Sequence, residues 1–208
     1  MTTLRNMRVN TQIVFIVYKV KEYCCMDKID RRILKSRQAI QSTFLQMLVK
    51  VGFDEITVKK LTEKANIGRK TFYLHYIDKY DLLDKIVDDH IAQLREICDQ
   101  KQDKGIIEGS ILWFSYFEQH KSLFAALFKS KGASSFRKKL LAFTMGDINK
   151  KLNEDSNPII DKPIFLKFLG SATMGVLESY VLEEVDSDIE AVATQVVQLY
   201  TKLLSLYE

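Results

Sequence analysis

Basic, hydroxyl and aromatic side chains gather in one short stretch of the chain, IGRKTFYLHY at 67–76. Arg69 and Lys70 stand at the expected start of a short helix, where aligned peptide dipoles leave partial positive charge and each cation costs roughly 0.3–1 kcal/mol. This placement becomes favourable when an anion binds there. Arg and Lys bind phosphate oxygens and the O6 and N7 atoms of guanine. The stretch therefore predicts a contact with nucleic acid.

Helical spacing indicates which side chains of this stretch face outward. Phe72 and Tyr76 are four residues apart and, together with Ile67, form the apolar side of the helix. The other side then presents groups that hydrogen-bond to base edges or phosphates, namely Arg69, Lys70, Thr71, Tyr73 and His75. A single basic residue on a short helix is usually only a solvated side chain. The prediction therefore depends on the combination and its spacing.

The elements before this stretch form a compact set of helices. Apolar residues at helical spacing predict a first helix from Asp27 to about Val51, which Gly52 ends with a left-handed residue. Thr57 is a plausible N-cap for a second helix, VKKLTEKA at 58–65. The tripeptide at 66–68 then turns the chain sharply. Two short helices that meet at a large angle, with a longer one behind them, predict a helix-turn-helix whose second helix enters the DNA major groove.

The rest of the chain also has apolar residues at three-to-four-residue spacing. A long helix is expected from Asp78 to a break at 103–105, followed by two helices that join at 119–122. Gly132 and Ala133 precede another helix, and NEDSNP at 153–158 is a loop. Two final helices are expected over 161–184 and 188–206. Both are apolar over a wide face, which indicates either a dimer interface or simply core. The predicted fold class is all-α.

Charge is distributed unevenly along the 208 residues. Residues 26–80 hold 12 Lys and Arg against 6 Asp and Glu, whereas residues 81–208 hold 15 against 20. A basic module followed by an acidic one suggests that the first meets a polyanion. An apolar content of 47% is enough for a sizeable core without disulfide staples.

No residue pattern indicates catalysis, a metal or a cofactor. Cys24 and Cys25 are adjacent and Cys98 is alone, so a disulfide framework and zinc ligation are not expected, and the reducing cytoplasm is the expected compartment. A nucleophile with its base, a phosphate-binding glycine loop and a paired acid and base are all missing. The chain is therefore not expected to be an enzyme.

The first 25 residues need a separate interpretation. The apolar run at 14–18 is too short to span a bilayer, and no cleavage site for a signal peptide follows it. Two interpretations remain: the segment lies upstream of a true start at Met26, or it is an arm that packs locally. We therefore divide the chain into an extension at 1–25, a helix-turn-helix domain at 26–78 and a helical domain at 79–208.

Residues 28–84 resemble the DNA-binding domain of the TetR/AcrR family of bacterial transcriptional regulators. The resemblance rests on a first helix ending in Gly-Phe and on ITVKKLTEKANIGRKTFYLHYIDKYDLL. It implies that Thr57 and Lys59 approach the DNA and that Lys79 meets a phosphate, in addition to the five residues identified above. Gly68 stands where the family usually has a serine cap, so a hydroxyl contact to phosphate is lost there.

The resemblance also implies how such a protein works. Members dimerise through their last two helices and bind palindromic double-stranded DNA, usually as repressors that a small effector releases. An apolar effector site is expected among aromatic and methionine side chains of the second domain: Trp113, Phe114, Phe117, Phe143, Met145, Phe168 and Met174. Control by a protein partner in place of a small molecule is the alternative. No cofactor and no membrane association are expected.

Overall fold

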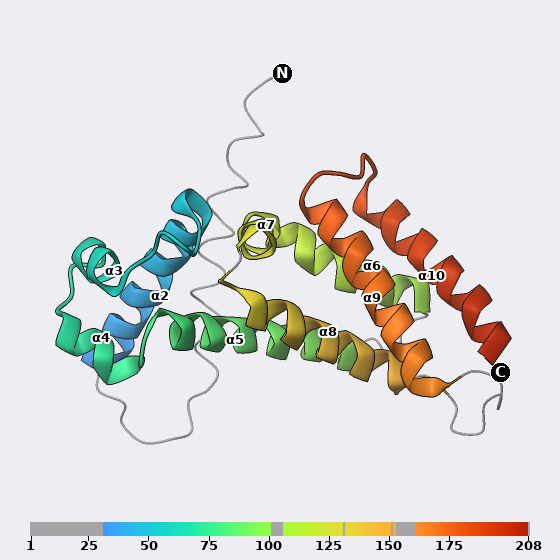
Figure 1. Ribbon diagram of the computed structural model, residues 1–208, viewed down its shortest axis with the longest axis horizontal. Coiled ribbons are helices and arrows are strands. Elements are labelled where there is room, and N and C mark those ends of the chain that lie inside the picture. Colours follow the sequence, from blue (N-terminus) through green and yellow to red (C-terminus); the bar gives the residue numbers. More distant parts are fainter. Residues whose placement is uncertain (1–30, 101–105, 131, 151, 153–160, 208) are drawn as a thin grey trace. The chain divides into compact units, whose positions relative to one another are not determined.

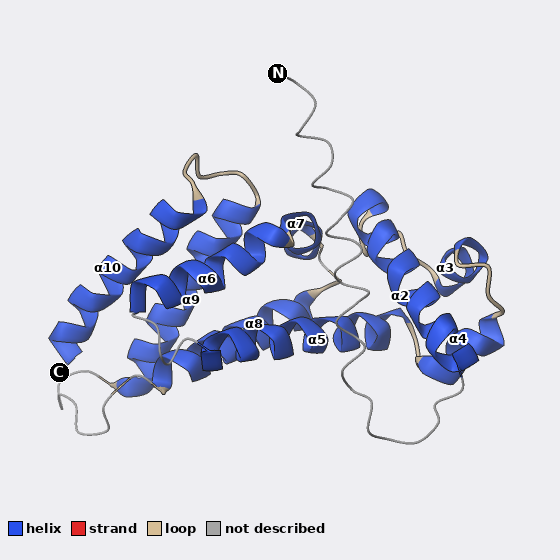
Figure 2. Ribbon diagram, turned by 180° about the vertical axis from the view of Figure 1, so that it is seen from behind, coloured by secondary structure: helices blue, strands red, loops and turns tan. Residues whose placement is uncertain are grey.

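The computed structural model describes residues 31–100, 106–130, 132–150, 152 and 161–207. These residues form nine α-helices, and none of them lies in a strand (Figures 1 and 2). The predicted all-helical fold is therefore confirmed. The expected break at 103–105, the loop at 153–158 and the extension at 1–25 lie outside the described residues.

The chain divides into a short N-terminal unit that ends at Ser36 and a second unit of residues 37–208. Helix α2 (Arg31–Val51) spans this boundary. In the first unit, the Ser36 hydroxyl donates to the carbonyl of Arg32 at 3.0 Å, which is a bond within the helix itself. All the contacts described below belong to the second unit.

The first helix ends and the second begins as the sequence predicts. Gly52 has φ +80°, and its amide donates to the Leu48 carbonyl at 3.1 Å. Thr57 caps α3 (Val58–Lys64), because its hydroxyl accepts a hydrogen bond from the Lys60 amide at 3.2 Å. Helix α4 (Arg69–His75) follows after a short turn. These three helices are the predicted helix-turn-helix.

A set of fully buried side chains holds α2, α3 and α4 together. Its members have no exposed surface: Ile40, Phe44, Leu48, Phe53, Ile56, Leu61 and Phe72. The rings of Phe44 and Phe53 meet edge to face at 6.2 Å, which brings the segment after α2 back onto that helix. Each such burial contributes about 1.5–3 kcal/mol, so this small domain has a well-defined core.

Helix α5 (Lys79–Gln100) begins at a carboxylate cap. One oxygen of Asp78 accepts from the amides of Tyr80 and Asp81, both at 2.8 Å. The predicted apolar stripe along this helix is confirmed: Leu82, Leu83, Ile86, Val87 and Leu94 are buried, and Ile91 and Ile97 are partly buried against the same core.

The remaining helices are α6 (Ile106–Gln119), α7 (Lys121–Lys129), α8 (Ser134–Asn149), α9 (Lys162–Val181) and α10 (Ile189–Tyr207). Their joins at His120 and at Gly132–Ala133 fall where the sequence predicts them. Helix α5 runs beside α8, and α6 beside α10, in both views (Figures 1 and 2). The core of this part is rich in rings, such as Phe117 and Phe124, whose centroids are 4.6 Å apart.

Among the described residues, α9 is long and apolar enough to cross a membrane by length and composition alone. In the structure, this helix packs against α7 and α8 and carries core residues such as Leu169 and Leu177. A core helix of this kind passes the same test.

Candidate nucleic-acid interface

The turn between α3 and α4 depends on a residue in the left-handed region. Asn66 has φ +54°, a conformation that Asn adopts more readily than most residues. Around it, the Ala65 amide donates to the Leu61 carbonyl at 2.8 Å and the Ile67 amide to the Thr62 carbonyl at 3.0 Å. These bonds end α3 and reverse the chain, so that α4 starts only a few residues later.

Two aromatic rings set the rotation of α4 about its own axis. Phe72 has no exposed surface and Tyr76 is 3% exposed, and their ring centroids lie 5.6 Å apart. Ile67 is half-buried and packs against the same core. Their burial confirms the prediction that these residues face inward.

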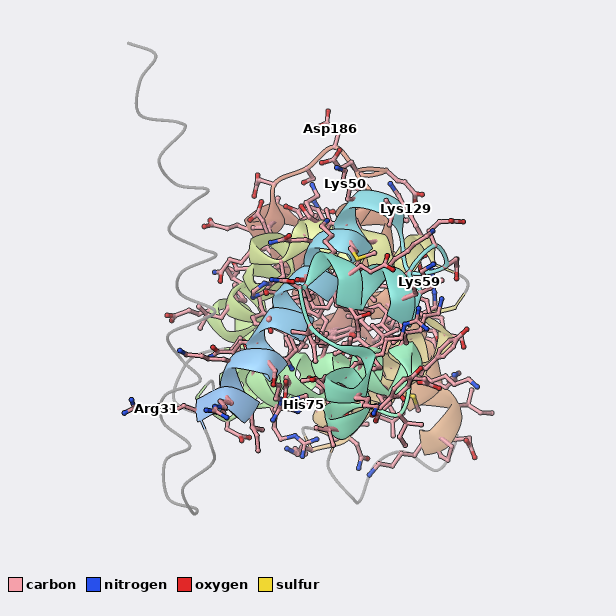
Figure 3. All side chains as sticks on the ribbon, turned by 90° about the vertical axis from the view of Figure 1, so that its left-hand side faces the viewer. Arg31, Lys50, Lys59, His75, Lys129 and Asp186 are labelled. Atoms are coloured by element: carbon pink, nitrogen blue, oxygen red, sulfur yellow. The ribbon has the colours of Figure 1, made fainter. Side chains whose placement is uncertain are left out.

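The opposite side of α4 is open to solvent. Arg69, Lys70 and Tyr73 are exposed, Tyr73 by 57%, while Thr71 and His75 are half-buried at the edges of the face. On the preceding helix, Thr57 and Lys59 are also exposed. Figure 3 looks onto these helices and labels Lys59 on α3 and His75 on α4. The structure therefore places these predicted DNA contacts on two neighbouring helices.

The electrostatics of this surface are positive. Neither α3 nor α4 has an acidic residue in its first turn, and Lys59, Lys60, Arg69 and Lys70 are all exposed. At the start of α4, Gly68 makes no side-chain capping bond, as its lack of a hydroxyl predicts. Cations at helix N-termini are favourable only beside an anion, which is the condition that a phosphate backbone supplies.

His75 differs electrostatically from the other residues of this surface. Burial, followed by the nearby positive charges of Arg37 and Lys85, lowers the pKa of its imidazole. A lowered pKa favours the neutral imidazole at pH 7, which can accept as well as donate a hydrogen bond. Its carbonyl oxygen accepts from the Lys85 ammonium at 3.1 Å, which fixes the end of α4 against α5.

Lys79 lies at the start of α5, with its ammonium turned toward the segment after α2. It donates to the carbonyls of Phe53 at 3.2 Å and Asp54 at 3.3 Å, and it lies 4.5 Å from the centre of the Phe53 ring. An ammonium has three donors, so two of them are used within the protein. Phosphate binding by Lys79 stays a prediction, and the structure adds a positioning role that sequence spacing does not indicate.

Leu74 also lies on the exposed side of α4, although the sequence analysis did not assign it to the interface. It is 83% exposed, the highest value among the exposed large apolar residues of the described chain. At about 100° per residue, Leu74 lies roughly opposite Phe72 and Tyr76 on α4. A helical projection of 69–76 identifies it from the sequence alone.

The predicted effector residues are only partly brought together. A cavity of about 60 Å³ lies between α6, α8, α9 and α10, and of the seven predicted residues Trp113 and Phe114 line it, beside Thr144, Leu169 and Tyr200. Phe117 and Met174 are buried and Phe143 and Met145 are half-buried, and none of these four lines that cavity. A drug-sized ligand needs roughly 300–1,000 Å³, so the cavity in this conformation does not hold one.

Phe168 does not belong to that set, and its prediction is corrected here. It is 58% exposed and lines a shallow surface groove with Pro163, Ile164, Lys167 and Ser171. Its neighbour Leu169 is 1% exposed, and about 100° of helix rotation separates the two side chains. Aromatic composition alone does not distinguish the two faces of α9.

Other candidate chemistry is not found in the part of the chain that the structure describes. No group of three His, Cys, Asp or Glu side chains there is arranged to hold a metal ion. Cys98 is buried and forms no disulfide bond among the described residues, and Cys24 and Cys25 lie outside them.

Comparison with known protein families finds two models that match consecutive parts of the chain. Residues 44–86 match the model of bacterial regulatory proteins of the tetR family, and residues 106–202 match that of a transcriptional regulator C-terminal region, TetR_C_8. The first match covers α3, α4 and most of the core beneath them. The second covers α6 to α9 and most of α10.

Individual relatives agree with these matches. An uncharacterised HTH-type transcriptional regulator of Bacillus subtilis (strain 168), YxbF, is 40% identical over 68 residues, which are 32% of this chain and 18% of that protein. The matched part thus spans less than a fifth of that curated relative. A TetR transcriptional regulator from Streptococcus agalactiae 2603V is 25% identical, with a TM-score of 0.69 over 82% of this chain and 96% of the other.

The dihydroxyacetone kinase operon activator DhaS also has this fold. It is 18% identical, with a TM-score of 0.60 over 83% of this chain and 98% of that one. At this identity, the similarity concerns the fold alone. The fold thus extends over both parts of the chain.

Proposed function

This chain is a member of the TetR family of transcriptional regulators and is a DNA-binding protein, and from that premise we propose that it is a repressor released by a small apolar effector. The observation that carries the DNA contact is α4 itself. Phe72 and Tyr76 are buried beneath it, so Arg69, Lys70 and Tyr73 project outward from a fixed helix. Arg and Lys would bind guanine edges or phosphates, and Tyr73 would reach a base or the backbone.

The proposed active form is a homodimer that binds a palindromic operator. Its interface would involve α9 and α10, where Ile164 is 69% exposed, Phe168 58% and Leu199 59%. Large apolar side chains that are exposed in one protomer are suited to burial against a second copy. A twofold dimer would place its two recognition helices about one turn of DNA apart, roughly 34–36 Å.

Effector binding in the second domain would reach the DNA through α5. Ser135 of α8 donates to Asp84 of α5 at 2.8 Å, and the Lys139 ammonium lies 2.7 Å from Asp88. Since α5 begins at Lys79, any shift of α8 acts on the helix that adjoins the DNA-reading domain. A coupling of about 1–3 kcal/mol would weaken operator binding by roughly 5- to 150-fold.

The small cavity gives this mechanism a physical requirement. A volume of about 60 Å³ has room for about two water molecules, so a larger effector must separate the surrounding helices as it enters. That separation would itself supply the movement that α5 transmits. We place the protein in the cytoplasm, where its operator would be.

Operator selection tests the DNA contact. Duplexes selected from the genome would be titrated with the protein at fixed salt, by fluorescence anisotropy, for the wild type and for Tyr73→Ala. We expect Tyr73→Ala to weaken binding by roughly 5- to 150-fold, the equivalent of about 1–3 kcal/mol for a specific contact. An unchanged binding curve would refute the assignment of this surface.

Matched controls distinguish the loss of a DNA contact in Tyr73→Ala from unfolding and from a change in net charge. Tyr73→Phe removes only the hydroxyl and keeps the ring. Lys138→Ala removes an exposed positive charge from α8, and we expect operator binding to be unaffected by it. A thermal midpoint for Tyr73→Ala close to that of the wild type would exclude unfolding as the cause.

Titrating the operator complex with apolar compounds tests the effector, and a promoter–reporter fusion tests the direction of regulation. Release of DNA by a compound, together with raised expression when the gene is deleted, supports the repressor proposal. Insensitivity to every compound favours control by a protein partner. Lowered expression on deletion would indicate activation, the role in the name of the structurally similar DhaS.

A further inference from the structure

An exposed leucine lies at the centre of the proposed DNA-reading face. Leu74 is 83% exposed, and on α4 it lies about 40° from Lys70 and about 60° from Thr71, on the side away from the buried rings. It is therefore flanked by side chains that hydrogen-bond, although it cannot do so itself. If the outward face of α4 enters the major groove, Leu74 enters with it.

Single exposed apolar residues are common on protein surfaces and by themselves indicate nothing. Two observations distinguish Leu74. It lies on a helix of only seven residues whose rotation is fixed by Phe72 and Tyr76, so its direction is determined by the core. Its surroundings are basic, since Arg69 and Lys70 are exposed on the same helix, and this charge matches a polyanion.

The chemistry of the major groove restricts what Leu74 can contact. Guanine and adenine present hydrogen-bonding groups there, and cytosine presents an amino donor; only thymine presents an apolar group, the C5 methyl. A leucine pressed onto a polar edge would leave that edge without a hydrogen-bond partner, which is unfavourable. A methyl group against the leucine would instead remove apolar surface of both from water.

We propose that Leu74 is a specificity-determining residue that reads the methyl group of one thymine in each operator half-site. The proposal rests on the DNA-binding function and extends it to a base that hydrogen-bonding residues do not read. Burial of one methyl group changes an equilibrium constant by about fourfold. Removing that methyl should therefore weaken binding by about this factor, provided that Leu74 is present.

Deoxyuridine substitution tests this directly, because uracil differs from thymine only by lacking the methyl. A duplex is first selected with the full-length protein, and each of its thymines is then replaced singly by deoxyuridine. We expect one position per half-site at which the wild type loses about fourfold in affinity, and at which Leu74→Ala shows no loss. Replacing that thymine by 5-methylcytosine should weaken wild-type binding less than replacing it by cytosine.

Ile77→Ala is the matched control. Ile77 is 80% exposed, nearly as much as Leu74, but it follows the end of α4. We expect this variant to keep the full dependence on the thymine methyl. Both substitutions remove exposed side chains, so both variants should melt at the wild-type temperature.

The possible failures are distinguishable. If no duplex is selected, the proposed recognition of an operator by α4 fails and the Leu74 assignment fails with it. If a duplex is bound and the deoxyuridine profile of Leu74→Ala equals that of the wild type, only the Leu74 assignment is refuted. The Leu74 assignment is also refuted if deoxyuridine at no thymine position weakens binding by the wild type. It is refuted equally if Ile77→Ala, and not Leu74→Ala, loses the dependence of affinity on the thymine methyl.

Discussion

Gly132, in the segment between α7 and α8, has no room for a side chain. A Cβ atom at this position would lie 2.6 Å from an oxygen of Asp54 and 2.7 Å from a ring carbon of Phe53. Asp54 could rotate away, but its oxygen accepts a hydrogen bond from the Gly132 amide at 3.2 Å, and this bond would be lost. The Phe53 ring cannot move aside easily, because it is fully buried and packs against the rings of Phe44 and Tyr80, with centroid distances of 6.2 and 5.1 Å.

We therefore predict that Gly132→Ala destabilises the protein by overpacking. The cost of forcing one methyl group into a packed contact is about 1–3 kcal/mol. For a chain of this length, about 1 kcal/mol corresponds to a shift of roughly 2–4 °C, so the thermal midpoint should fall by roughly 2–12 °C. Calorimetry at one fixed protein concentration measures this, because the proposed dimerisation would make the midpoint depend on concentration.

Two other glycines provide a graded control. A Cβ at Gly146, on α8, would meet nothing within 4 Å, so Gly146→Ala should raise stability by about 0.5–1 kcal/mol through helix propensity. At Gly170 the nearest atom is Cγ of Met145 at 2.7 Å, and this flexible side chain can shift, so Gly170→Ala should fall between the two. A Gly132→Ala protein as stable as Gly146→Ala would refute the reasoning.

Three further predictions concern the cap, the buried histidine and the exposed face of α9. Thr57→Ala should lower the free energy of unfolding, measured by chemical denaturation, by about 1 kcal/mol because the Lys60 amide loses its acceptor. Thr57→Asn should keep most of the wild-type stability, and equal losses in the two variants would argue against the cap. Burial, and next the charge of His120, lowers the pKa of His90 to about 3, so the free energy of unfolding should fall by up to about 1.4 kcal/mol per pH unit as the pH drops below about 6.5. His90→Gln should reduce this dependence on pH, and an unchanged dependence in that variant would exclude His90 as its source. Phe168→Glu should yield monomers in sedimentation equilibrium, since it puts a charge on the proposed apolar interface, and a persistent dimer would place that interface elsewhere.

The direction of the pH effect follows from which form of His90 the folded protein holds. In the unfolded chain, His90 binds a proton below about pH 6.5, whereas in the folded chain its Nδ1 lies 2.5 Å from the Tyr116 hydroxyl and the ring stays neutral. Between about pH 6.5 and the folded pKa of about 3, the unfolded state therefore binds more protons, so stability rises with pH. Above about pH 6.5, both states are neutral and the dependence vanishes.

Local rules account for the parts of the fold that sequence reasoning predicts correctly. The end of α2 at Gly52, the cap at Thr57 and the inward rings Phe72 and Tyr76 each depend on residues at most four positions apart. Such short-range relations are set by helical geometry and by the donors and acceptors that a helix end leaves open. A pattern of this kind can be found in a single sequence.

Packing between distant segments accounts for what sequence reasoning missed. The lysine at 79 was expected only at a phosphate, yet its ammonium bonds to carbonyls 25 and 26 residues earlier. Phe168 was expected in a cavity and lies on the surface of α9, and only Trp113 and Phe114 of the seven predicted effector residues line the cavity of about 60 Å³. The volume between helices depends on how all of their side chains interlock, and no single spacing contains that information.

The sequence by itself determined that this chain is helical, that it has a basic helix-turn-helix and that it resembles the TetR/AcrR family, because helix periodicity, capping and a short motif are all local properties. Only the tertiary structure decided that the Lys79 ammonium bonds to the carbonyls of Phe53 and Asp54, that Gly132 packs against Phe53 and that Phe168 faces outward on α9. The physical reason is that burial is a property of the whole packed chain: a side chain is inside only when residues far away in the sequence cover it.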